Sequence, residues 1–224
     1  MKATKELLNN WINSISFIER AYDVPTLKVH NDNVFIREIE DVTHIAIAGS
    51  NGNRSDWIGS RGNLTITQDK IKDLNKTATR GFVNASLSCY NKIVSYVQQN
   101  KVCICGHSRG GPIASILACL LHEKNNKEIT LTTFGSPRFT HDESFNDYDF
   151  IKNSCRVVSN GDGITAIPER LFFNRKLVNM IHLGNEFVIG EKKDRHAGRF
   201  FDYYDAHAIS MYKSICYDML QELN

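Results

Sequence analysis

The sequence predicts an α/β fold in which a mostly parallel central sheet is covered by helices on both faces. Short apolar runs typical of buried strands alternate along the chain with longer stretches in which apolar residues recur at helical spacing. The first two strand-like runs follow each other closely, as in an antiparallel pair. In such a fold the carboxyl ends of the parallel strands meet at one edge of the sheet, so we expect a functional site there.

The elements follow in order from their periodicity. An amphipathic helical pattern opens the chain at residues 4–21, and strands at 34–39 and 43–48 flank Glu40 and Asp41 as the antiparallel pair. The remaining predicted elements are helices at 81–99, 111–121 and 206–223, and strands at 101–105, 128–134, 155–159 and 177–182.

Length and composition favour one domain over residues 1–224. The chain has 224 residues, which is enough for one buried core and short for two, and no repeat or proline-rich linker divides it. Basic and acidic side chains nearly balance, at 27 and 25. A field strong enough to attract nucleic acid is therefore not expected, and we predict no nucleic-acid partner.

The first residues lack the features of a targeting segment. Residues 1–11 are amphipathic and interrupted by charge, and no apolar run reaches transmembrane length. This favours a cytoplasmic location with the six cysteines reduced. Neither a Cys-x-x-Cys pair nor a His-x-x-x-His pair occurs, so we predict no metal ion and no cofactor.

A Gly-His-Ser-Arg-Gly pentapeptide at residues 106–110 lies between a strand-like run and a helix-like run. This is the context in which a G-x-S-x-G motif forms a tight strand-to-helix turn that exposes its serine as a nucleophile. The flanking glycines remove Cβ atoms that would clash where strand and helix approach each other. Ser108 is therefore the candidate nucleophile.

A serine nucleophile needs a histidine base and a carboxylate that orients the histidine, in the chain order serine, acid, histidine. Asp162 follows a strand-like run and lies between two glycines that can bend the chain back. The competing acids lie in a polar stretch at 140–149, and none ends a strand: they are Asp142, Asp147 and Asp149. The candidate bases after the acid are His182, His196 and His207.

Several segments, in order, resemble the class 3 lipases, the family of the α/β-hydrolase fold that includes the fungal-type triacylglycerol lipases. The resemblance covers about residues 42–212. It rests on Ile-Ala-Gly-Ser at 47–50 with Asp-Trp at 56–57, Arg-Gly-Phe at 80–82, Gly-His-Ser-Arg-Gly-Gly at 106–111, Thr-Phe-Gly-Ser-Pro-Arg at 133–138, residues 156–162 with Ile-Pro at 167–168, and His-Leu-Gly-Asn-Glu at 182–186.

The resemblance implies a catalytic triad of Ser108, Asp162 and His207, because the family's catalytic histidine similarly lies near an aspartate at the start of the last helix. His182 would then be structural. The resemblance also implies an oxyanion hole made by the backbone N–H groups of Ser50 and Arg109, with the Ser50 hydroxyl as a further donor.

The sequence departs from the family pattern at Arg109, where the family commonly has leucine. We expect this arginine to pair with a carboxylate such as Glu143 or Asp56, with an anionic group of a substrate as the alternative.

The segment 51–62, where the family carries its lid, is the second departure. It contains only Trp57 and Ile58 as large apolar residues, so strong activation at a lipid interface is not expected.

The predicted function is that of a serine carboxylic ester hydrolase of lipase type, which cleaves acyl esters through an acyl-enzyme intermediate. The partners are a small-molecule or lipid ester substrate and, transiently, a membrane or lipid surface. Phospholipase, lysophospholipase or acyltransferase activity on the same triad remains open, and so does a non-catalytic binding protein that has kept the fold.

Overall fold

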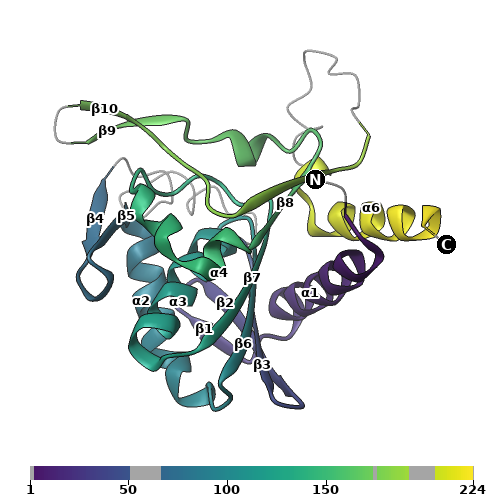
Figure 1. Ribbon diagram of the computed structural model, residues 1–224, viewed down its shortest axis with the longest axis horizontal. Coiled ribbons are helices and arrows are strands. Elements are labelled where there is room, and N and C mark those ends of the chain that lie inside the picture. The colour runs from purple at the N-terminus through teal and green to yellow at the C-terminus, as the bar shows by residue number, and fades with distance from the viewer. Residues whose placement is uncertain (1–2, 51–66, 174–175, 192–204, 224) are drawn as a thin grey trace.

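The structure is a computed structural model that describes residues 3–50, 67–173, 176–191 and 205–223. Within these residues a seven-stranded sheet runs through the molecule in the order β1-β2-β3-β6-β7-β8-β11 (Figure 1). Its strands are β1 (Leu27–Val29), β2 (Asp32–Ile39), β3 (Val42–Ile47), β6 (Lys101–His107), β7 (Glu128–Phe134), β8 (Cys155–Ser159) and β11 (Asn185–Ile189).

The sheet begins antiparallel and continues parallel, which confirms the predicted fold class. Strands β1, β2 and β3 pair antiparallel, and Ile39 lies opposite Val42 across a turn in which Glu40 has a φ of 54°. From β3 to β11 every neighbouring pair is parallel. The carboxyl ends of β3, β6, β7 and β8 therefore point to the same edge of the sheet.

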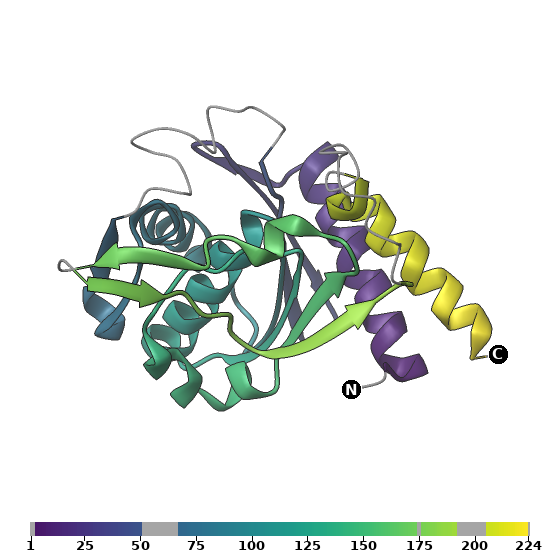
Figure 2. The ribbon, with the colours of Figure 1, turned by 90° about the horizontal axis from the view of Figure 1, so that it is seen from above.

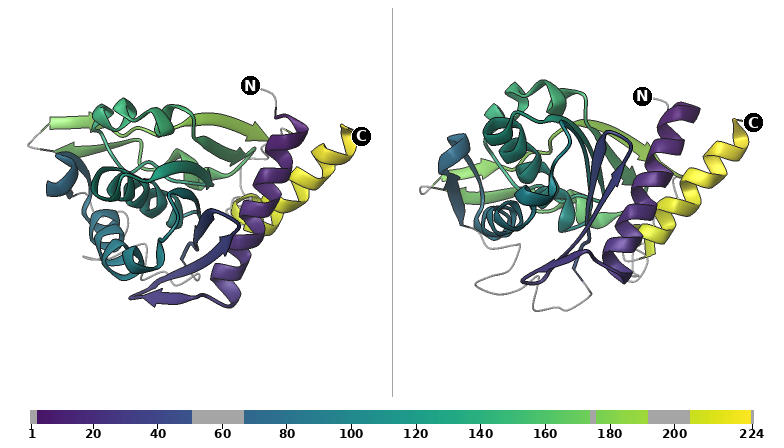
Figure 3. Two further views of the ribbon diagram at one scale, coloured as in Figure 1. Left: turned by 60° about the horizontal axis from the view of Figure 1, so that its bottom comes forward. Right: turned by 90° about the horizontal axis from the view of Figure 1, so that it is seen from below.

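Helices cover both faces of the sheet (Figure 2). One face carries α2 (Arg80–Ile93) and α3 (Gly110–Asn125), which pack against each other, and the other carries α1 (Lys5–Asp23) and α6 (Ile209–Glu222), which lie side by side (Figure 3). On β3, Ile45 and Ile47 belong to the core under α2 and α3, whereas Ala46 belongs to the core under α1 and α6. This alternation is the two-residue period of a strand that is buried on both faces.

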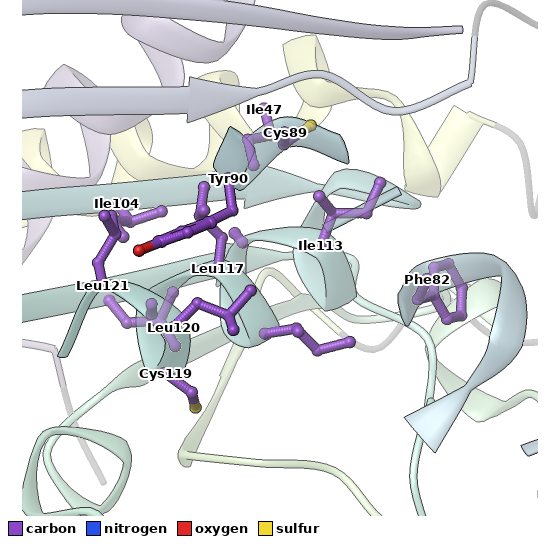
Figure 4. Close-up of a cluster of buried hydrophobic side chains, with 14 of the residues drawn as sticks. Ile47, Phe82, Cys89, Tyr90, Ile104, Ile113, Leu117, Cys119, Leu120 and Leu121 are labelled. Carbon is purple, nitrogen blue, oxygen red and sulfur yellow. The ribbon is translucent and has the colours of Figure 1, made fainter. Parts of the chain in front are cut away.

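The core under α2 and α3 is the larger of the two. Every residue of α3 from Gly110 to Leu121 is buried, because this helix packs against β3, β6 and β7 of the sheet and against α2. Its side chains meet Ile104 of β6 and Tyr90 of α2 (Figure 4).

The helix α1 is buried along one stripe only, as its amphipathic sequence predicts. Thr4 caps its first turn by accepting a hydrogen bond from the Leu7 N–H. The buried residues recur at three- and four-residue spacing: Leu8, Trp11, Ile12, Ile15, Ile18 and Ala21.

Two predicted elements were wrong in detail. The strand expected at 177–182 is not in the main sheet: β10 (Lys176–Asn179) pairs with β9 (Arg170–Phe173) in a separate antiparallel hairpin, and β11 pairs with β8 instead. The helix expected at 81–99 ends at Ile93 and passes into a short 3-10 turn, η3 (Val94–Tyr96). A further hairpin, β4 (Gln68–Ile71) with β5 (Lys76–Thr79), was not predicted.

Candidate active site

Ser108 lies in a sharp turn between β6 and α3, as the pentapeptide predicts. Its φ is 53°, a left-handed conformation that costs a non-glycine residue about 1 to 3 kcal/mol. A side chain at Gly106 would collide with the backbone of Gly110, and one at Gly110 would collide with the Ile47 carbonyl group. The Ser108 N–H donates to the Phe134 carbonyl oxygen at 2.9 Å, which ties the turn to the end of β7.

The structure brings Ser108, His207 and Asp162 into one hydrogen-bonded chain, although 99 positions separate the serine from the histidine. The Ser108 Oγ lies 2.7 Å from His207 Nε2, and His207 Nδ1 lies 2.8 Å from Asp162 Oδ2. All three residues are buried. Because Nδ1 faces a carboxylate, it carries the proton of the neutral ring, and Nε2 is left to accept the Ser108 hydroxyl proton.

Asp162 is held in place by the loop that follows β8. Its Oδ1 accepts the Ile164 N–H at 2.9 Å, at the start of the 3-10 turn η5 (Gly163–Ala166). Its own N–H donates to the Ser159 carbonyl oxygen at 3.0 Å. One carboxylate oxygen is therefore fixed by the backbone, and the other faces His207.

Tyr212 is a site residue that the sequence analysis missed. Its hydroxyl donates to Asp162 Oδ2 at 2.6 Å, the same oxygen that faces His207 Nδ1. Burial, and then the Asp162 charge, raise the Tyr212 pKa well above its usual value, so the hydroxyl keeps its proton. The available signal was its position, five residues after His207 and within α6.

Gly135 lies directly against the histidine and the aspartate. It follows β7 with a φ of 57°, and a Cβ atom there would lie 2.8 Å from Asp162 Oδ2 and 3.0 Å from His207 Nδ1. A side chain at this position would therefore force these two groups apart.

We expect Gly135→Ala to lower kcat by about 100-fold, since misplacing a reacting group by about 1 Å can cost this much. Steady-state hydrolysis of a soluble ester measures the effect. Gly190→Ala is the matched control, because Gly190 also has a positive φ, of 82°, and an added Cβ there would meet only the flexible end of Ile215. Equal kcat values for the two variants would contradict the expectation.

Ser50 and its neighbour Gly49 follow β3 at the same edge of the sheet. A Cβ atom on Gly49 would lie 2.8 Å from the Ser108 Cβ, so this segment touches the turn. The Ser50 Oγ is buried, and no described residue pairs with it. Arg109 follows Ser108 directly and is the N-cap residue of α3, where backbone N–H groups favour negative charge.

The Arg109 side chain forms a largely buried ion pair with Asp32, at the start of β2, with 11% of the Arg109 side chain and 3% of the Asp32 side chain exposed. Arg109 Nε lies 2.7 Å from Asp32 Oδ1, and Nη2 lies 3.0 Å from Oδ2. The expected partner Glu143 was therefore wrong, and Asp56 lies outside the described residues. No local pattern predicts this pair, because 77 positions separate the two residues.

We expect Arg109→Leu to lower the free energy of unfolding by about 3 to 5 kcal/mol, because it leaves the Asp32 carboxylate buried without its partner. Urea denaturation measures this change. The double variant Arg109→Leu with Asp32→Asn should regain part of the loss. The ratio of anionic to neutral ester hydrolysis should stay the same, and a shift toward neutral esters would show instead that the guanidinium reaches the substrate.

The other residues considered from the sequence lie elsewhere. His182 is beside Arg156 and Arg138, and burial followed by these charges lowers its pKa to about 3.

Asp142 accepts the Thr77 N–H, and the side chain of Asp149 is 90% exposed. Asp147 is also exposed. His196 and the lid segment 51–62 lie outside the described residues, so the expected weak interfacial activation stays a prediction.

Comparison with known protein families decides the classification. The profile of the class 3 lipase family matches residues 44–172, which is more than half of the chain. The chain belongs to the class 3 lipase family. It is accordingly a carboxylic ester hydrolase with an α/β-hydrolase fold. No curated protein matches the sequence.

Solved structures of fungal lipases share this fold. The triacylglyceride lipase of Rhizomucor miehei is 19% identical, with a TM-score of 0.62 over 84% of this chain and 82% of its own. The lipase of Rhizopus microsporus var. chinensis is 21% identical, with a TM-score of 0.61 over 87% and 77%. A triacylglycerol lipase of Penicillium expansum is 14% identical, with a TM-score of 0.63 over 84% and 81%.

The described residues contain neither a helix that could span a membrane nor a cluster of metal-binding side chains. None of the helices in the described ranges is both long and apolar enough to span a bilayer. Within the same ranges, histidine, cysteine, aspartate and glutamate side chains do not gather in threes as a metal site would require.

Proposed function

We propose that this class 3 lipase cleaves acyl esters through a covalent intermediate on Ser108, with His207 as base and Asp162 as the group that orients His207. The hydrogen-bonded chain from Ser108 Oγ through the imidazole to Asp162 Oδ2 carries the proposal. A solved neighbour, 19% identical, is described as a triacylglycerol lipase whose catalytic centre is a serine protease triad.

In the acylation step Ser108 Oγ attacks the ester carbonyl carbon, and its proton passes to His207 Nε2. The Asp162 carboxylate stabilises the imidazolium that forms and keeps the ring in place. The tetrahedral intermediate then expels the alcohol, which takes the proton from Nε2, and the acyl group stays on Ser108. Water repeats the sequence on the acyl-enzyme and releases the acid.

The negative charge on the carbonyl oxygen requires donors at the carboxyl edge of the sheet. We assign this role to the backbone N–H groups of Ser50 and Arg109, together with the Ser50 hydroxyl. The buried Ser50 Oγ supports the assignment, because none of the described residues pairs with it and a hydroxyl in this position can donate to a substrate oxygen. One such donor is typically worth about 2.7 to 4 kcal/mol of transition-state stabilisation.

The substrates we propose are small-molecule or lipid esters, with transient contact to a lipid surface for the latter. A phospholipid or lysophospholipid would use the same acylation step. An acyltransferase differs only in the acceptor, because an alcohol replaces water in the second step.

A fluorophosphonate probe tests the proposal. The probe should form one covalent adduct, located on Ser108 by mass spectrometry, and leave the buried Ser115 and Ser136 unmodified as internal controls. A panel of p-nitrophenyl esters, triacylglycerols and phospholipids, with and without an added alcohol acceptor, then separates lipase, phospholipase and acyltransferase activity. Absence of both adduct and turnover would support the non-catalytic binding protein.

A further inference from the structure

Tyr22 and His107 form a hydrogen-bonded chain next to the site that the proposed mechanism does not use. Tyr22 is in the last turn of α1, and His107 ends β6 directly before Ser108. The Tyr22 oxygen lies 2.7 Å from His107 Nδ1, and it accepts the Gly49 N–H at 2.8 Å. At the other end His107 Nε2 lies 2.8 Å from the His207 carbonyl oxygen.

The hydrogen bonds of Tyr22 and His107 allow only one arrangement of their protons. Because the His207 carbonyl oxygen only accepts, His107 Nε2 must carry a proton. Burial lowers the His107 pKa to about 3, so the ring is neutral and its Nδ1 has no proton. Burial raises the Tyr22 pKa to about 12, so Tyr22 keeps its proton and donates it to Nδ1. The Tyr22 proton is therefore committed to His107 and is not available to a substrate oxygen.

The hydrogen bonds at the two ends of the Tyr22–His107 pair hold backbone groups that lie on either side of Ser108. At one end, the Gly49 N–H belongs to the residue before Ser50, the proposed oxyanion donor. A Cβ atom on Gly49 would lie 2.5 Å from the Tyr22 oxygen, so only glycine allows this approach. At the other end is the backbone of the proposed base His207, whose ring centroid lies 4.8 Å from that of His107. A neutral His107 places no positive charge against the imidazolium that forms on His207.

We propose that Tyr22 and His107 act as a positioning pair that fixes the oxyanion segment and the His207 backbone relative to each other. The pair acts through the Gly49 N–H and the His207 carbonyl group and touches no substrate. This inference rests on the proposed function, because it explains how the proposed oxyanion donor Ser50 and the proposed base His207 are kept at a fixed distance from each other. Removing the hydrogen bond between Tyr22 and His107 should therefore slow the chemical step and leave substrate binding nearly unchanged.

The test is a double-mutant cycle of Tyr22→Phe and His107→Gln. The glutamine NH2 group can reach the place of Nε2 and keep the bond to the His207 carbonyl group, but glutamine has no ring that holds an acceptor rigidly at the place of Nδ1. Each variant should lower kcat by about 10- to 100-fold with KM within about twofold. The double variant should be scarcely slower than either single variant, because both remove the same link.

Tyr90→Phe is the matched control, since the Tyr90 hydroxyl also makes one side-chain hydrogen bond, to Asn125 Oδ1 at 2.8 Å, away from the site. It should leave kcat unchanged. A kcat for Tyr22→Phe or His107→Gln equal to that of Tyr90→Phe, or additive effects in the double variant, would overturn the inference. The fluorophosphonate adduct on Ser108 separates the two proposals: without it in the wild type the proposed function fails, whereas with it the cycle tests the positioning pair alone.

Discussion

Replacing Ser108 with alanine is expected to lower kcat for ester hydrolysis by about 10⁵-fold, on the scale seen when a serine nucleophile is removed from other hydrolases. The reason is that no other group in the described site is placed to attack while His207 Nε2 takes the proton. The fold should persist, because the substitution removes one hydroxyl and leaves the backbone turn in place. Steady-state kinetics with a p-nitrophenyl ester and thermal unfolding measure the two effects.

Ser115→Ala is the matched control for this variant. Ser115 is also a buried serine, on the helix that follows the turn, and its hydroxyl donates to the Gly111 carbonyl oxygen at 3.0 Å. It should retain activity. Residual activity of Ser108→Ala within tenfold of the wild type would remove Ser108 from the role of nucleophile.

The second large effect is expected for the base and its partner. Asp162→Asn and His207→Ala should each lower kcat by about 10⁴-fold, because an asparagine no longer holds the required tautomer and an alanine accepts no proton. Asp142→Asn and His182→Ala are the controls, since neither side chain contacts Ser108 or His207 through the bonds that the structure shows. If His196→Ala were the inactive variant and His207→Ala the active one, the base would have to be reassigned.

The pH dependence checks the same assignment. Only a neutral imidazole accepts the Ser108 proton, so kcat/KM should rise with pH and then level off. Burial lowers the pKa values of His107 and His182 to about 3, so both are already neutral above about pH 5 and contribute nothing to this rise. A kcat/KM that falls as the pH is raised from acidic to neutral in the wild type would contradict a histidine base.

Features of this fold that depend on residues close together in the sequence could be predicted. The turn at Ser108 could be predicted because the G-x-S-x-G pattern is local, and Gly106 is required by its contact with Gly110, four residues further along the chain. The antiparallel pair β2 and β3 could be predicted because its turn is short and both flanking runs are rich in β-branched residues. The position of Asp162 also follows from local chemistry, since it lies shortly after the end of β8, between two glycines, and begins a turn.

What the sequence leaves open is the choice between partners that are distant in the chain. Residues 176–179 and 185–189 both have strand character, and only the packing of the whole sheet decides that the second run lies beside β8. For the same reason Asp32 could not be distinguished from other carboxylates as the partner of Arg109. The hydroxyl groups of Tyr22 and Tyr212 are likewise given their roles by helices that approach from the other face of the sheet.

The division of the site between the two helical layers gives the molecule a mechanical property. Ser108 is attached to α3 on one face of the sheet, while His207 lies just before α6 on the other face. A shear of one layer against the other would act almost directly on the distance between Oγ and Nε2, before any strand separated. The distance between Ser108 Oγ and His207 Nε2 therefore depends on how α3 and α6 are held across the sheet, and not only on whether the chain is folded.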